Sequence, residues 1–119
     1  MNGLILFAHG SRDPAWAMPF EAMLASVKAA DAQTPAALAY LELMQPDFAS
    51  TTAQLVAQGV THIRVLPVFL AAGKHLRVDL PELVAFATTA HPGLSFTVLP
   101  PAGESPALRS AIVVLALQK

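Results

Sequence analysis

His62–Leu70, with the sequence His-Ile-Arg-Val-Leu-Pro-Val-Phe-Leu, carries the strongest β-strand signal in the chain. Its Ile, Val and Phe side chains are the types that strands favour. Pro67 interrupts the run, and proline has no N–H group to donate to a neighbouring strand. The interruption therefore predicts either a bulge or the point where strand pairing ends.

Three further apolar runs of strand length lie on either side of this stretch: Gly3–Ala8, Ala37–Leu41 and Ser95–Leu99. Gly3–Ala8 is apolar throughout, which is typical of a strand that is covered on both faces. The chain is thus predicted to contain four strands.

The first helix is expected after the first strand. Asp13 and Pro14 form an N-cap followed by proline at the first helical position, and the helical pattern continues to about Ala30. Pro19 falls inside that span. Proline is unfavourable within a helix, so the helix either starts near Met18 or is broken there.

The other helices also follow strands. They are expected after Pro46-Asp47, over about Pro81–Ala90, and after Ser105-Pro106. Gly59 is the natural end of the first of these. A long loop, Ala71–Asp79, is expected between the third strand and the helix that follows it.

This alternation of strands and helices predicts an α/β protein. At 119 residues the chain is expected to be a single domain, residues 1–119. Repeated strand–helix units imply a four-stranded parallel sheet with helices on both faces and right-handed crossovers.

Composition excludes several classes of function. The net charge is −1 with only 7 Lys and Arg residues, which argues against nucleic acid as a partner. There is no cysteine, so disulfides, thiolate metal sites and cysteine nucleophiles are excluded, and a reducing cytoplasm is favoured. No apolar run approaches the ~20 residues of a membrane span, and the N-terminus lacks the features of a signal peptide.

The chain is also unusually apolar. Hydrophobic residues make up 55% and charged residues 13% of the sequence. We therefore expect part of the apolar surface to be buried against a second copy of the chain. The alternative is that alanine raises the hydrophobic content without creating an adhesive surface.

Three ionisable residues, His9, Glu42 and His75, follow one another at intervals of 33 residues, each at or shortly after the end of a predicted strand. Ligands of parallel sheets bind outside the carboxyl ends of the strands. Two imidazoles and a carboxylate at that edge would suit a divalent metal or proton transfer. Taken singly, each residue also has an ordinary explanation as part of a surface turn, a solvated strand end or a loop.

Basic residues accompany both histidines. Arg12, Lys74 and Arg77 lie within three positions of His9 or His75. A ligand with several carboxylates would explain this, since guanidinium and ammonium groups pair with carboxylates. The alternative is ordinary surface charge at the start of a helix.

Two other functions of the first turn fit less well. Histidine phosphatases have an arginine directly before the His-Gly pair, and this chain has Ala8 there. Ser11 lacks the Gly-x-Ser-x-Gly setting of a hydrolase nucleophile. His62 and His91 lie at a strand start and a helix end, and are expected to be structural or solvent-exposed.

Three motifs resemble those of the CbiX/SirB family of class II tetrapyrrole chelatases. They are His9-Gly10-Ser11-Arg12, Leu41-Glu42 and Phe69-Leu70-x-x-Gly73-x-His75-x-x-x-Asp79-x-Pro81. The length resembles the short, single-domain form. The resemblance implies a chelatase-like, flavodoxin-like half-domain that acts as a homodimer. It also implies ATP-independent insertion of Co²⁺ or Fe²⁺ into sirohydrochlorin, with Ni²⁺ or Zn²⁺ as substitutes in vitro and no further cofactor.

The resemblance also implies roles for individual residues. His9 and His75 match metal-binding positions, His9 matches the proposed proton acceptor, and Glu42 matches an acidic position that lines the cleft. The expected substrate-binding residues are Ser11, Arg12, Glu42, Phe69, Leu70, Gly73, Lys74 and Arg77. Two alternatives remain: a non-catalytic carrier of metal or tetrapyrrole, and a half-domain that needs a different partner chain.

Overall fold

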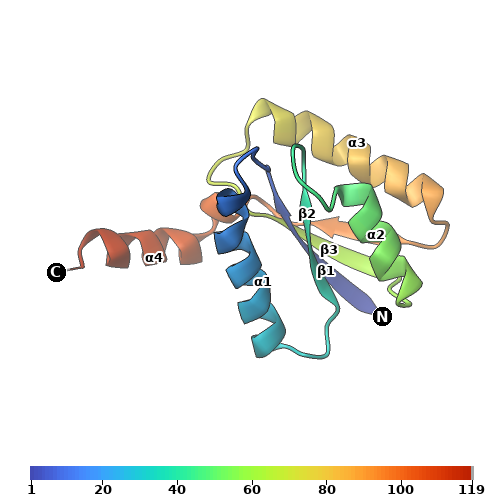
Figure 1. Ribbon diagram of the computed structural model, residues 1–119, viewed down its shortest axis with the longest axis horizontal. Coiled ribbons are helices and arrows are strands. Elements are labelled where there is room, and N and C mark those ends of the chain that lie inside the picture. The colour runs from blue at the N-terminus through green and yellow to red at the C-terminus, as the bar shows by residue number, and fades with distance from the viewer. Residues whose placement is uncertain (119) are drawn as a thin grey trace.

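The computed structural model describes residues 1–118, with every side chain among them except that of His75. Strands and helices alternate along the chain (Figure 1). The strands are β1 (Asn2–Ala8), β2 (Ala36–Tyr40), β3 (His62–Pro67) and β4 (Ser95–Val98). The α-helices are α1 (Met18–Ala30), α2 (Phe48–Ala57), α3 (Lys74–Ala90) and α4 (Pro106–Ala116), and the 3₁₀ helices are η1 (Pro14–Ala17) and η2 (Ala102–Glu104).

The four strands form one parallel sheet in the order β2-β1-β3-β4. Strand β1 is central, so Ile5 pairs with Ala37 on one side and with Val65 on the other. The predicted α/β class and parallel sheet are confirmed. The consequence for function is that the strand ends after β1, β2 and β3 are neighbours.

Helices lie on both faces of this sheet (Figure 1). Helices α2 and α3 cover one face, where Ile5 and Phe7 point into the larger apolar cluster. Helix α1 covers the other face, where Leu6 and Ala8 belong to a second cluster. Strand β1 is therefore buried from both sides, as its uninterrupted apolar sequence predicts.

The third strand tests the two outcomes predicted for Pro67, which are a bulge or the end of strand pairing. Strand β3 stops at Pro67 instead of continuing to Leu70. The prediction that pairing ends at Pro67 is thus confirmed over the alternative of a bulge within a longer strand.

The predicted loop Ala71–Asp79 is wrong, because α3 already begins at Lys74. Gly73 is its N-cap residue and supplies no side-chain cap, so the sequence holds no capping signal there. Pro81, taken as the first helical position, instead lies inside the helix. His75 is consequently part of the first helical turn and not of a loop.

The structure also shows that the first helix starts near Met18 and is not broken at Pro19. Asp13 caps the 3₁₀ helix η1 by accepting a bond from the Ala15 N–H to its Oδ1, and α1 proper begins at Met18 with Pro19 in its first turn. A proline is tolerated there because its missing N–H would have no partner.

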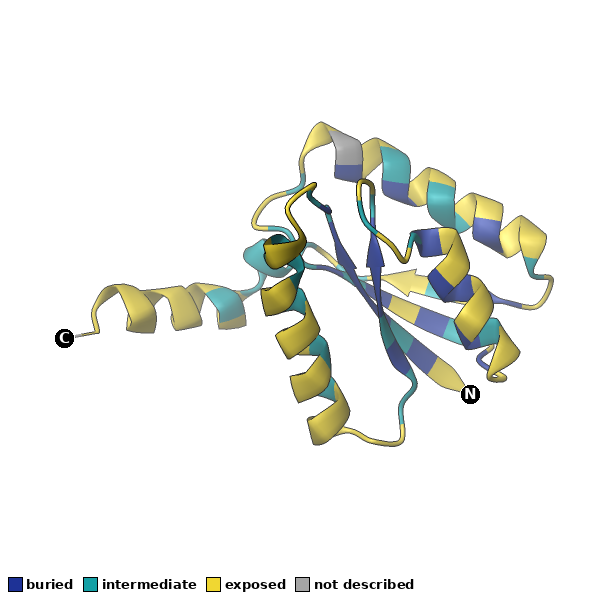
Figure 2. Cartoon of the chain, in the orientation of Figure 1, coloured by how far each residue is buried: buried dark blue, intermediate teal, exposed yellow. Residues whose placement is uncertain are grey.

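Helix α4 is the exception to the layered arrangement, because it projects away from the sheet (Figure 1). Its most extensive contact among the described residues is with η2. Figure 2 shows it as exposed along most of its length. Among the described residues, no helix is both long enough and apolar enough to cross a membrane.

Candidate functional site

The turns after β1 and β2 and the start of α3 lie at the same edge of the sheet (Figure 1). The first turn carries His9 and Arg12, the second carries Glu42, and α3 begins with Lys74 and His75. The structure therefore brings the predicted site residues to one edge, as parallel topology requires.

His9 and Glu42 face each other across this edge. His9 Nε2 lies 3.4 Å from Glu42 Oε1, and the two side chains are 43% and 49% exposed. His9 Nδ1 lies 3.1 Å from the Gly10 carbonyl oxygen, which can only accept, so Nδ1 carries a proton. In neutral His9 the lone pair is then on Nε2 and points towards the carboxylate.

Backbone hydrogen bonds fix the two residues relative to each other. The Leu41 N–H donates to the Ala8 oxygen at 2.8 Å, and the Glu42 N–H donates to the His9 oxygen at 3.1 Å. The turn after β2 thus remains paired with the turn after β1 beyond the end of the sheet. The positions of His9 and Glu42 are set by the fold and not only by their side chains.

Gly10 permits this close approach. Its φ of +97° lies in the left-handed region, and a Cβ there would be 1.8 Å from the Glu42 carbonyl oxygen. Any other residue would therefore push away the segment that carries Glu42. In the sequence Gly10 is only one member of the His9-Gly10-Ser11-Arg12 motif, and its contact with Glu42 depends on tertiary structure.

Leu43 is a residue that the sequence analysis missed. It follows Glu42 with a φ of 68°, in the left-handed region that side-chain-bearing residues rarely adopt. Such conformations concentrate at ligand sites. A leucine gives no sequence signal for this conformation, so only the structure reveals it.

The ring of Phe69 packs against the ring of His9. Its ring centroid is 6.2 Å from that of His9 in an edge-to-face arrangement, and it stacks on buried Phe7 at 6.2 Å. These contacts limit the rotation of the imidazole. Leu70 next to it is 74% exposed and offers apolar surface outside the strand ends.

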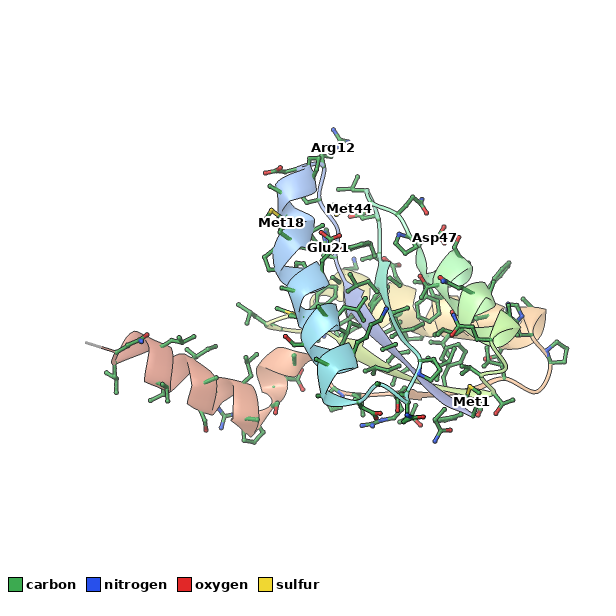
Figure 3. The ribbon with its side chains drawn as sticks, turned by 60° about the horizontal axis from the view of Figure 1, so that its bottom comes forward. Met1, Arg12, Met18, Glu21, Met44 and Asp47 are labelled. Atoms are coloured by element: carbon green, nitrogen blue, oxygen red, sulfur yellow. The ribbon has the colours of Figure 1, made fainter. Side chains whose placement is uncertain are left out.

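Positive charge surrounds the edge. Arg12 lies at the tip of the turn after β1 and extends outward (Figure 3). Lys74 and Arg77 are exposed in the first turn of α3, which contains no acidic residue. Because a helix N-terminus itself carries partial positive charge, this edge is suited to an anionic ligand.

The distance between His9 Nε2 and Glu42 Oε1 fits two ligands of one divalent metal ion. Two ligands about 2.1 Å from a tetrahedral metal lie about 3.4 Å apart, and 3.4 Å is the separation of His9 Nε2 and Glu42 Oε1. Among the described side chains no group of three metal-ligating residues forms. The side chain of His75, which is predicted to be a metal ligand together with His9, lies outside them, although its backbone is in the first turn of α3 at this edge.

Tyr40, the last residue of β2, does not supply acid–base chemistry. Burial, and to a lesser extent the charge of Glu21, raises the pKa of Tyr40 above its ordinary value, so the phenol stays neutral at physiological pH. Its ring lies 6.3 Å from that of Trp16, in the cluster under α1. Tyr40 therefore contributes packing beneath the edge and no charged group at neutral pH.

Comparison with known proteins agrees with this geometry. The sequence profile of the CbiX family matches residues 3–117. The crystal structure of a CbiX protein from Marinobacter aquaeolei superposes with a TM-score of 0.85 and 35% identity, covering 98% of this chain and 94% of that one.

Two curated relatives are chelatases that differ in metal. The sirohydrochlorin ferrochelatase of Arabidopsis thaliana chloroplasts is 29% identical over 102 residues, which are 86% of this chain and 45% of that protein. The sirohydrochlorin cobaltochelatase of Methanothermobacter thermautotrophicus is 33% identical over 82 residues, which are 69% of this chain and 57% of that protein. The chain thus spans about half the length of the curated relatives that it matches.

Proposed function

This chain belongs to the CbiX family, and on that premise we propose that it inserts Co²⁺ or Fe²⁺ into sirohydrochlorin without ATP. The observation that carries the proposal is the exposed His9–Glu42 pair, whose donor atoms lie 3.4 Å apart at the carboxyl edge of the sheet. Relatives that act on sirohydrochlorin with iron and with cobalt support the reaction but do not select the metal. Imidazole and carboxylate ligands accept either ion.

The reaction requires a metal ligand and a proton acceptor. Insertion of the metal displaces two pyrrole N–H protons from the macrocycle. In the proposal, His9 Nε2 first holds the incoming ion or accepts a proton, His75 is the second ligand, and Glu42 relays the second proton. The ion is substrate, and we propose no other cofactor.

The surroundings of the pair fit the rest of the macrocycle. Arg12, Lys74 and Arg77 would pair with the carboxylates of sirohydrochlorin. Phe69 and Leu70 offer an apolar wall for the flat ring, and Ser11 and Gly73 are the remaining proposed contacts. A ring of this size needs cover on its second face, and in the proposal a second copy of the chain supplies it.

We accordingly propose a homodimer in which two copies together correspond in length to one of the longer relatives. The chain spans 45% of the plant enzyme, so two copies supply a similar amount of polypeptide. The absence of cysteine supports a reducing compartment, and we propose the cytoplasm.

An anaerobic assay with excess sirohydrochlorin tests this function. Wild-type protein with Co²⁺ and then Fe²⁺ should change the absorbance of the macrocycle through many turnovers, above the uncatalysed rate. His9→Ala should lower kcat by about 100-fold or more, the usual effect of losing a general base. His75→Ala should also lower turnover, because it removes the second proposed ligand of the incoming metal. His91→Ala, at the far end of α3, is the matched control and should keep the wild-type rate.

Two outcomes would contradict the proposal. A spectral change that stops at one equivalent would identify a carrier instead of an enzyme. Wild-type rates in His9→Ala and His75→Ala would show that insertion occurs elsewhere on the protein.

A further inference from the structure

Helix α4 is an apolar helix with almost no cover. Four large aliphatic residues of α4 and Leu117 directly after it are between 47% and 73% exposed, and the four are Ile112, Val113, Val114 and Leu115. From Ala111 onward the helix is apolar around its whole circumference, and a helix of that kind is normally buried. Figures 1 and 3, which view the chain from two directions, both show α4 extending away from the sheet. The helix therefore lacks the partner that its sequence requires.

The sheet has an uncovered apolar surface on the face that α1 covers only in part. An apolar groove of about 460 Å³ runs between α1 and the end of β3. It is lined by Leu6, Phe20, Met23, Val27, Leu66, Val68, Phe69, Leu70, Ala102 and Leu108. Leu108 is in the first turn of α4, so the helix begins at the rim of the groove and then leaves it.

The groove has a defined end. Further along the same sheet face, His62 bonds Ser95 at 2.7 Å and Thr97 at 2.8 Å, and Arg64 is exposed. Both ring nitrogens of His62 are hydrogen-bonded and Arg64 is exposed to solvent, so neither residue needs apolar cover. The uncovered apolar surface is therefore limited to a strip suited to one short helix.

The connection before α4 prevents the helix from turning back into the groove of its own chain. The Gly103 N–H in η2 donates to the Phe69 oxygen at 2.9 Å. A Cβ at Gly103 would be 1.7 Å from the Leu70 oxygen, so η2 lies directly against the body of the domain. Only Ser105 separates η2 from α4, whereas a reversal of the chain takes about four residues.

We propose that α4 of one copy fills the groove of a second copy, and that the exchange is reciprocal. The proposal rests on the homodimer of the proposed function and specifies its contact surface. Each copy has one groove and one free helix, so a two-fold axis satisfies both and closes the assembly.

The area of the contact can be estimated from the length of α4. Eleven residues of α4 form a helix about 16 Å long and about 10 Å wide. Two such helices in two grooves bury on the order of 1,000 Å² in total, which reaches the lower limit for a specific interface. Ile112 and Leu115 follow Leu108 at helical spacing and continue the face that already contacts the groove.

Light scattering of the full-length chain after size exclusion tests the exchange. Wild-type protein should have twice the 12.5 kDa mass of one chain. Ile112→Asp on α4 and Met23→Asp in the groove should each reduce the mass to that of a monomer, because a carboxylate cannot be buried in an apolar groove. Both residues are exposed in the single chain, so neither substitution should prevent folding. Ser110→Asp, on the other side of α4, is the matched control and should remain dimeric.

Each result has a separate meaning. Monomeric wild-type protein would overturn both the exchange and the proposed homodimer. A dimer that survives Ile112→Asp or Met23→Asp would overturn the exchange and leave the homodimer intact. Turnover of sirohydrochlorin is measured in a separate assay. A protein that fails to catalyse the chelatase reaction is therefore distinguished from one that fails to dimerise or to exchange α4.

Single cysteines provide a second test, because the natural chain has none. Ile112→Cys protein mixed with Met23→Cys protein should, when oxidised by oxidised glutathione, form a disulfide-linked pair of one chain of each kind. Ala25→Cys lies two residues further along α1 and faces away from Met23, so it should remain unlinked. Equal linking of both α1 positions, or linking of neither, would overturn the exchange.

Discussion

Most of the surroundings of His9 in the candidate site are not local in sequence. Its ring contacts Phe69, its Nε2 faces Glu42, and its backbone oxygen accepts a bond from the Glu42 N–H. The sequence predicted that His9 and Glu42 converge, because parallel strand ends do. It could not predict the steric role of Gly10 or the strained Leu43, since both depend on how two turns meet.

Replacing Gly10 tests whether close approach of the turns positions the pair. Gly10→Ala should lose about 1–2 kcal/mol from the left-handed conformation and about 1–3 kcal/mol more from the collision with the Glu42 oxygen. Gly93→Ala has a similar φ of +91° and no atom within 4 Å of its Cβ, so it should lose only the first amount. Urea unfolding measures both, and Co²⁺ titration should show weaker binding for Gly10→Ala alone. Equal losses for the two variants would contradict the steric explanation.

The charge of Glu42 is expected to contribute to metal binding. Glu42→Gln keeps the shape of the side chain but removes the charge, so the Kd for Co²⁺ should rise by about tenfold or more. Calorimetric titration measures the change. Glu82→Gln, which replaces an exposed acid on α3, should bind as the wild type does. If the two variants bind alike, the charge of Glu42 does not contribute to metal binding.

At the scale of elements, strands were easier to predict than the start of α3. Apolar runs locate all four strands to within a few residues, because burial on both faces leaves a strong pattern. The start of α3 has no capping side chain, and Pro81 resembles a first-turn proline although it lies inside the helix. Contacts of Leu76 and Leu80 with the core hold this part of the chain helical, and such contacts cannot be derived from local sequence.

Asp47 lies between the end of β2 and the second helix. Its carboxylate is expected to make the stability of the protein depend on pH. Its Oδ1 accepts a bond from the Ser50 N–H at 2.8 Å, and the backbone and side chain of Ser50 lower the pKa of Asp47. A lowered folded-state pKa contributes stability above the unfolded-state value of about 3.9, and this is lost as the pH falls through the folded value.

Asp47→Ala should therefore lose about 1 kcal/mol of unfolding free energy at pH 7, and the difference from wild type should shrink below about pH 4. Chemical unfolding at several pH values measures it. Asp47→Asn keeps a capping oxygen without the ionisable group, so its cost at pH 7 should be small. A difference between Asp47→Ala and wild type that is constant down to pH 2 would exclude the capping carboxylate as its cause.

At the scale of the whole molecule, composition anticipated what the structure shows at α4. The high apolar content predicted surface for a second copy, and the exposed aliphatic residues of α4 account for part of that content. The sequence could not indicate which helix is left uncovered, because all four helices contain apolar positions. That distinction arises from the short connection at Ser105 and from the contact of Gly103 with Leu70.

Reciprocal exchange makes thermal stability depend on concentration. For wild-type protein the Tm should rise by roughly 5–10 °C over a hundredfold increase in protein, because association favours the folded dimer. The Tm of Ile112→Asp should stay constant over the same range. Calorimetry at several concentrations measures both, and a wild-type Tm independent of concentration would argue against a dimer coupled to folding.

The central position of β1 also affects how the protein is made. Strand β1 is the first to leave the ribosome, but one of its two neighbours in the sheet, β3, ends only at Pro67. At about 5–20 residues per second, a nascent chain takes roughly 3–12 s to add those residues. During this interval one of the most apolar segments of the protein has no complete sheet to join. Binding by a chaperone in that period would protect the nascent chain from aggregation, and the period ends when β3 emerges and pairs with β1.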